Sequence, residues 1–165
     1  MSRKYGWTLR IIPEDDRYRQ IANGFIRALP QEVQRYFEVQ PIANGWKKAL
    51  EAVGEQGMDR FKERHVLVLI DYDGNGSIRQ RAVDEALHDK PKAFCLGPKD
   101  EAEDLERCLN GGLSGCTKFK CGERFASADF VCTDEIWKNE QLDTPFNKAT
   151  LVRLCPLLRQ NIRHS

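Results

Sequence analysis

The 165-residue chain lacks several features that would place it in a special class of protein. Its longest apolar run, residues 66–70, is far too short to cross a bilayer, and no apolar signal segment precedes the first acidic residues. It has no internal repeat and no low-complexity tract. We therefore expect a cytoplasmic protein without membrane contact, formed by one domain over residues 1–165. Its core covers about residues 5–110 and a C-terminal extension covers about residues 111–165.

A strong net charge is also missing. The formal charge of +1 produces no global basic field, so any contact with nucleic acid has to come from a local patch. No Cys-x-x-Cys pair occurs among the six cysteines, and in a reducing compartment we expect free thiols, several of them buried. A zinc site formed by Cys116, Cys121, Cys132 and a distant fourth ligand is an alternative with loose spacing.

The pattern of apolar residues alternates between the two regular periods. Strands are predicted at residues 7–12, 36–42, 65–70 and 93–96, with helices at residues 21–29, 46–53, 83–87 and 100–109. The continuously apolar stretch 65–70 is typical of a central strand covered on both faces. The alternation predicts an α/β fold with a mostly parallel, Rossmann-like central sheet flanked by helices.

The remaining third of the chain has weaker signals. Residues 110–120 are rich in glycine and predict a loop, whereas residues 125–137 fit no single element. Residues 148–162 predict a C-terminal helix that Pro156 interrupts.

Acidic residues follow three of the four predicted strands. Glu14 follows the first, Asp71 and Asp73 follow the third, and Asp100 and Glu101 follow the fourth. Ligands of open parallel sheets gather at the carboxyl ends of the strands, so these acids are expected to converge. If the third strand continues to Asp73, Asp71 and Asp73 lie on the same face, because alternate residues share a side.

The segment DYDGNG, residues 71–76, fits part of a calcium-binding EF-hand loop. Asp71, Asp73, Asn75 and Gly76 occupy the first, third, fifth and sixth positions of such a loop. The twelfth position is Ala82, which has no oxygen to bind calcium, and a strand rather than a helix precedes the segment.

A second interpretation comes from the haloacid-dehalogenase-like phosphatases, which the buried strand followed by Asp-x-Asp-Gly resembles. The resemblance implies that Asp71 is a nucleophile and Asp73 a general acid. Asn75 stands where that family has threonine, and the motif lies in the middle of the chain rather than near its start.

A third interpretation uses residues 5–110. "RIIPEDDRYRQIANGFI" with Glu14, "VLVLIDYDG" with Asp71 and Asp73, and "AFCLGPKDEAEDLERCL" together resemble the Toprim domain of topoisomerases, primases and related nucleases. The resemblance implies that Glu14, Asp71 and Asp73 form a catalytic site with Mg²⁺ or Mn²⁺ as cofactor. It further implies that Glu101 and Asp104 are additional metal ligands.

Carboxylates suit this chemistry because they hold a divalent ion with open coordination positions beside a phosphate. Glu14 is expected to complete the site or to act as general base. Nearby basic residues are expected to hold the phosphates of a nucleic acid without reading its sequence. They are Arg17, Arg19, Arg79, Arg81, Lys92 and Lys99.

We therefore expect a metal-dependent phosphodiesterase or nuclease whose substrate is nucleic acid. The chain also resembles small stand-alone bacterial Toprim-like proteins, some of which belong to mobile-element or phage-defence gene sets, and this implies a protein partner in a defence complex. The alternative from another class is a non-catalytic module that binds nucleic acid, a nucleotide or a protein partner in a larger assembly.

Overall fold

A four-stranded sheet forms the centre of the computed structural model, which describes residues 6–110, 117–127 and 135–162. All strands are parallel and their order is β2-β1-β3-β4. The strands are β1 (Thr8–Pro13), β2 (Phe37–Val39), β3 (Arg64–Leu69) and β4 (Ala93–Leu96). The predicted α/β class, with a parallel Rossmann-like sheet flanked by helices, is confirmed.

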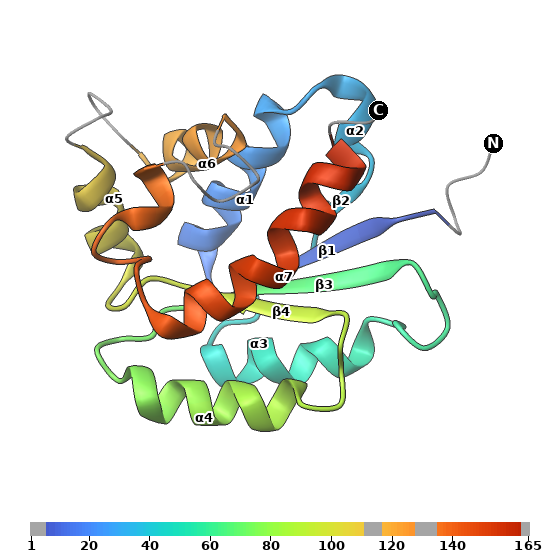
Figure 1. Ribbon diagram of the computed structural model, residues 1–165, viewed down its shortest axis with the longest axis horizontal. Coiled ribbons are helices and arrows are strands. Elements are labelled where there is room, and N and C mark those ends of the chain that lie inside the picture. Colours follow the sequence, from blue (N-terminus) through green and yellow to red (C-terminus); the bar gives the residue numbers. More distant parts are fainter. Residues whose placement is uncertain (1–5, 111–116, 128–134, 163–165) are drawn as a thin grey trace.

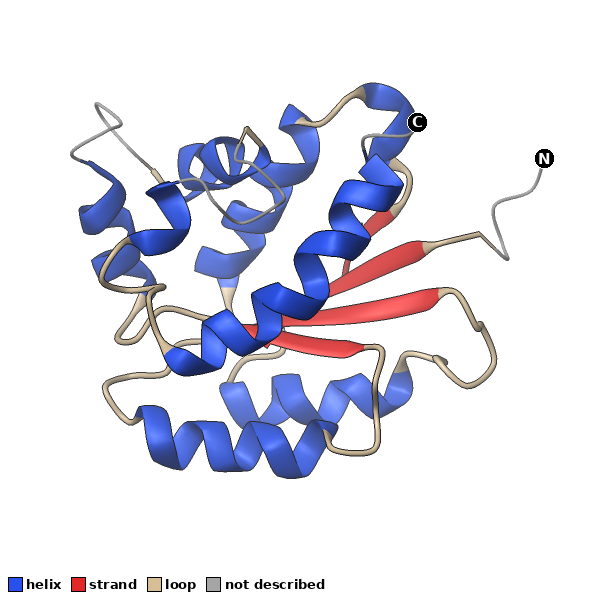
Figure 2. Ribbon diagram, in the orientation of Figure 1, coloured by secondary structure: helices blue, strands red, loops and turns tan. Residues whose placement is uncertain are grey.

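Helices cover both faces of the sheet. In Figure 1, α3 and α4 lie against one face, and α1, α6 and α7 lie on the other side. Figure 2 shows the strands as the layer between them. The helical elements are α1 (Asp16–Ala28), α2 (Gln31–Gln34), α3 (Trp46–Ala52), η2 (Val53–Glu55), α4 (Gly76–Leu87), α5 (Ala102–Asn110), α6 (Lys118–Ala126), η3 (Glu135–Lys138) and α7 (Pro145–Ile162).

The unbroken apolar sequence of residues 66–70, in β3 and directly after it, follows from this layering. Val66, Val68 and Ile70 pack in the cluster that includes residues of α3 and α4. Leu67 and Leu69 point to the opposite side, toward residues of α1 and α7. Successive side chains of a strand alternate between faces, so a strand covered on both faces needs apolar residues at every position.

Helix α6 packs closely against α1 through two glycines. A Cβ atom at Gly24 would lie 1.9 Å from the Phe119 carbonyl oxygen, and one at Gly122 would lie 1.9 Å from the Ile21 carbonyl oxygen. No other residue type lets the two backbones approach this closely. The prediction of a loop over residues 110–120 is wrong at its end, because α6 begins at Lys118.

The prediction that Pro156 interrupts the last helix is wrong. Helix α7 runs from Pro145 to Ile162 with Pro156 inside it. Pro156 is exposed, whereas Leu151, Leu154 and other apolar residues at helical spacing are buried. An interior proline costs a helix about 3 kcal/mol, and burial of a whole apolar stripe outweighs this cost.

Two other predicted elements differ in length. The strand predicted at residues 36–42 pairs only over Phe37–Val39. The short helix predicted at residues 83–87 is the end of α4, which begins at Gly76 directly after Asn75 as N-cap.

Cys95 and Cys108 are free thiols as expected, but Cys155 is disulfide-bonded. Cys116 and Cys132, which the zinc alternative needs, lie outside the described residues. Within the described ranges, none of the helices combines the length and the apolar character that a membrane span requires.

Candidate metal site

Two strand ends bring acids from distant parts of the chain together. Strands β1 and β3 are neighbours, with Pro13 paired in register with Leu69, and the Glu14 amide donates to the Leu69 carbonyl at 3.0 Å. Glu14 and Asp15 directly follow β1, and Asp71 follows β3 after one further residue. The convergence expected of Glu14 and Asp71 is therefore present, at the carboxyl edge of the sheet.

Three carboxylates form a compact acidic cluster, consisting of Glu14, Asp15 and Asp71. One oxygen from each lies within 4.8 Å of the others, so together they could hold a metal ion. The Glu14 Oε2 atom accepts a hydrogen bond from the Asp71 amide at 2.8 Å. Oxygen-only carboxylate sets of this kind suit hard cations such as Mg²⁺ and Mn²⁺.

The Asp71 carboxylate is held by both of its oxygens. Its Oδ1 atom accepts from the Tyr18 hydroxyl and from the Ala102 amide, which is 3.1 Å away. Its Oδ2 atom pairs with Nη2 of Arg17 at 2.7 Å. The side chain is only 8% exposed. These contacts fix the orientation of the carboxylate before any ligand arrives.

Tyr18 has a double role that explains its position. Its ring lines an apolar cavity of about 110 Å³ between the sheet and helices α1 and α7. Its hydroxyl donates a hydrogen bond to Asp71 Oδ1. Burial raises the pKa of Tyr18 well above its usual value, and the negative charge of Asp71 adds to this effect, so the hydroxyl stays a hydrogen-bond donor.

Burial of the acidic cluster disfavours its negative charges. Desolvation raises the pKa of Glu14, against the hydrogen bond from the Asp71 amide and together with the charge of Asp71. Desolvation likewise raises the pKa of Asp71, against the hydrogen bond from Tyr18 and the charge of Arg17. A bound cation would relieve both effects, because it favours the ionised carboxylates.

Asp73 lies outside the acidic cluster. Strand β3 ends at Leu69, and Asp73 has a φ of 54°, so the premise that the strand continues to Asp73 and aligns it with Asp71 is wrong. The Asp73 side chain is 53% exposed, and its nearest described cation is Arg79 at 4.0 Å. The helical start of α4 at Gly76 also departs from the continuous twelve-residue loop of the calcium-binding interpretation.

The acids after β4 take other roles. Asp104 accepts from the Glu101 amide at 3.1 Å at the start of α5 and pairs with Arg107 at 2.9 Å. Glu101 is exposed, and the negative charge of Asp71 is the main cause that raises its pKa. Neither belongs to the acidic cluster, whereas Glu103 reaches it through Arg17.

The six basic candidates separate into two groups. Arg17 and Arg79 touch the site: Arg17 pairs with Asp71, and Arg79 donates to the Asp71 carbonyl at 2.5 Å while its guanidinium covers the Trp46 ring at 4.2 Å. These two cations therefore border the acidic cluster from different helices.

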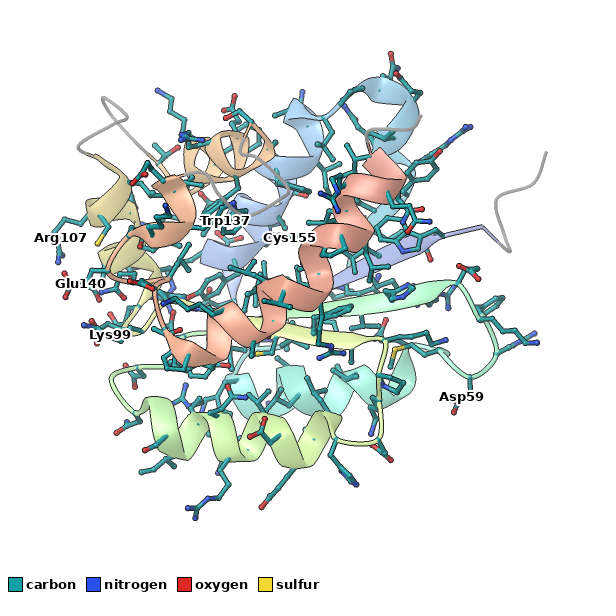
Figure 3. All side chains as sticks on the ribbon, viewed as in Figure 1. Asp59, Lys99, Arg107, Trp137, Glu140 and Cys155 are labelled. Atoms are coloured by element: carbon teal, nitrogen blue, oxygen red, sulfur yellow. The ribbon has the colours of Figure 1, made fainter. Side chains whose placement is uncertain are left out.

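The other four candidates lie elsewhere. Arg19 pairs with Asp16, Arg81 is exposed on α4, and Lys99 pairs with Glu140 at 3.1 Å on the outer surface shown in Figure 3. Lys92 precedes β4 and donates to the Met58 carbonyl at 2.6 Å, at the amino ends of the strands. This edge of the sheet is opposite the acidic cluster, so Lys92 does not contact the cluster.

Sequence reasoning missed Asp15, Tyr18 and Glu103. Asp15 stands beside Glu14 in the acidic stretch and is the N-cap of α1, a common position for aspartate. Nothing in the sequence links Tyr18 to Asp71, which is 53 residues away. Only the packing of α1 across the end of β3 makes these contacts.

Comparison with known proteins adds no relative. No family model, no curated protein and no solved structure matches the chain. The function is therefore argued from the site itself.

Proposed function

We propose that the protein is a divalent-metal-dependent phosphodiesterase that cleaves nucleic acid, with Glu14, Asp15 and Asp71 as ligands for Mg²⁺ or Mn²⁺. The observation that carries this proposal is the meeting of these three carboxylates at the carboxyl edge of a parallel sheet. The resemblance of residues 5–110 to Toprim domains supports it, since that resemblance implies an acid after the first strand beside an acid after a later strand.

The donor set fits the metal that the proposal requires. A divalent ion would supply Lewis acidity toward the phosphate and a more acidic bound water. Asp71 is oriented for this task by Tyr18 and by the amide of Ala102. Glu14 is half-buried and its Oε2 atom accepts from the Asp71 amide, which orients it as the third ligand of the ion.

Arg79 is the residue that we expect to bind the phosphate at this site. Its guanidinium is held between the Asp71 carbonyl and the Trp46 ring, so it is a fixed positive charge beside the acidic cluster. A fixed guanidinium binds a phosphate with little loss of conformational freedom. Arg79 would position the phosphodiester while the three carboxylates hold the ion.

The geometry argues against the phosphatase alternative. That alternative needs Asp73 beside Asp71 as its general acid, and Asp73 does not belong to the acidic cluster. Asp73, the general acid of that interpretation, is turned to solvent by its left-handed backbone.

A second candidate function is a non-catalytic module that binds nucleic acid or a protein partner. The observation in its favour is that Arg17 already satisfies Asp15 and Asp71 without any metal. An ion-pair network of this type can be purely structural. The expected role in phage defence belongs to either function, as cleavage of invading nucleic acid or as a subunit of a larger complex.

A matched pair of variants tests the enzymatic function. Asp15→Asn removes one ligand charge but keeps a good N-cap for α1, so the helix start is preserved. Asp16→Asn changes the neighbouring acid, which contacts only Arg19 and Gln20 among the described residues. Single- and double-stranded DNA and RNA are incubated with each protein in Mg²⁺, Mn²⁺ or EDTA.

We expect cleavage that needs the metal and falls about a hundredfold in Asp15→Asn, which is the usual effect of losing one electrostatic group of a site. Asp16→Asn should cleave like the wild type. Cleavage in EDTA, or equal activity of the two variants, would contradict the proposal. Binding of nucleic acid without cleavage by any of the three proteins would favour the module.

A further inference from the structure

One cation is already paired with two of the three acids of the acidic cluster. The Arg17 guanidinium donates to Asp15 Oδ2 from Nε at 2.9 Å and from Nη2 at 2.6 Å, and Nη2 also lies 2.7 Å from Asp71 Oδ2. Among the described residues, Arg17 is the only cation that forms ion pairs with these carboxylates. The ligand oxygens of two of the three acids therefore already have a positive partner.

A further acid, Glu103, accepts a hydrogen bond from the other end of the same guanidinium. Nη1 of Arg17 lies 2.6 Å from Oε2 of Glu103, which is on the first turn of α5. Glu103 is outside the acidic cluster and is 42% exposed. Arg17 thus has one partner that it can keep if it gives up Asp15 and Asp71.

The same two oxygens cannot serve a guanidinium and a divalent ion equally well. Both partners are positive, and they would repel each other at ion-pair distance in a partly buried site. Arg17 cannot lose its proton to escape this repulsion, because a guanidinium stays protonated in proteins. One of the two cations has to yield.

Resting on the proposed function of the acidic cluster, we propose that Arg17 is the resting counter-ion of the metal site and competes with the divalent cation for Asp15 and Asp71. On metal binding the guanidinium releases these two carboxylates and stays paired with Glu103. The metal affinity of the protein is therefore set by the strength of the Arg17 ion pairs as well as by the ligands.

Arg19 offers a matched control for this competition. It is on the same turn of α1 and carries the same charge, but it pairs with Asp16 at the surface. Arg17→Met and Arg19→Met remove one charge each and keep most of the apolar stem. Both substitutions remove one positive charge from the chain and change its net charge equally, so a difference between them reports the direct contact.

The experiment measures Mn²⁺ binding to the full chain, by the electron paramagnetic resonance signal of free Mn²⁺ and by calorimetry. We expect Arg17→Met to bind Mn²⁺ about tenfold more tightly than the wild type or more, since charged hydrogen bonds no longer have to break. Arg19→Met should bind within about twofold of the wild type. Adding Asp15→Asn to Arg17→Met should abolish the gain.

Arg17→Lys keeps the proposal testable if Arg17→Met does not fold. A lysine retains the charge but cannot bridge two carboxylates with a planar fork, so its Mn²⁺ affinity should lie between those of the wild type and Arg17→Met. Equal or weaker Mn²⁺ binding by the Arg17 variants would overturn the competition while leaving the metal site standing. Absence of Mn²⁺ binding in the wild type and in all variants would overturn the proposed function as well.

Discussion

The substitution Asp71→Asn tests how much of the stability depends on one buried carboxylate. Asp71 and asparagine have the same shape, so the change removes charge and acceptor capacity without leaving a cavity. If the amide nitrogen replaces Oδ1, it faces the Ala102 amide, which is also a donor. If it replaces Oδ2, it faces Nη2 of Arg17. The first orientation leaves the buried Ala102 amide without an acceptor, and the second sets two donors against each other.

Burial raises the pKa of Asp71, but this does not mean that a neutral amide can replace it without cost. A protonated Asp71 avoids the conflict between two facing donors. The hydroxyl oxygen of a protonated carboxyl group keeps lone pairs that can still accept from neighbouring donors. An amide nitrogen has no lone pair for that purpose. The unsatisfied donor costs about 1–3 kcal/mol, and the loss of charge-assisted bonds adds to this.

We expect Asp71→Asn to lower the free energy of unfolding at neutral pH by about 3 kcal/mol. The loss is not larger because Arg17 is partly exposed and keeps its ion pairs with Asp15 and Glu103. For a chain of this size, that corresponds to a fall in Tm of roughly 6–12 °C. Urea unfolding followed by circular dichroism in EDTA measures the change without a contribution from metal.

Asp73→Asn is the matched control, because it is the same substitution two residues later on a side chain that is 53% exposed. Its effect should stay within about 0.5 kcal/mol. Equal unfolding midpoints for Asp71→Asn and the wild type, or an equally large loss in Asp73→Asn, would refute the assignment of Asp71 as the buried anchor of the site.

Three further predictions concern the fold and the pH dependence of stability. Gly122→Ala should lower the free energy of unfolding by about 1–3 kcal/mol in urea, since its Cβ would lie 1.9 Å from the Ile21 carbonyl oxygen; an unchanged midpoint would contradict this close packing. Asn147→Ala should cost about 2–4 kcal/mol by the same assay, because the Asn147 side chain satisfies both the amide and the carbonyl of Gly97. Burial raises the folded-state pKa of Glu14 above its ordinary value of 4.5, so its ionisation opposes folding. Relative to Glu14→Gln, the wild type should therefore lose stability as the pH rises from that value through the raised pKa, and a constant difference from about pH 4 to pH 7 would contradict this sign.

Local pattern was enough to predict the layered architecture. The apolar run at residues 66–70 has no polar position, so its strand needed cover on both faces, and β3 has it. Chain order then placed Glu14 and Asp71 at strand ends, and the parallel arrangement made their meeting an expected result. The start of α4 after Asn75 and the continuation of α7 through Pro156 were harder to predict from the sequence, because tertiary packing outweighed the local signals there.

Tertiary structure alone decided which acids form the site. Asp73 belongs to the same motif as Asp71, but a left-handed turn after β3 points it to solvent, and Asp15 takes the third place in the acidic cluster. The contacts of Tyr18, Arg17 and Glu103 depend on how α1 and α5 pack across the strand ends. The sequence determined which residues could reach the edge of the sheet, because strand periodicity and chain order are local properties. Which side chains touch there depends on backbone turns and helix packing, and these arise from contacts between residues far apart in the chain.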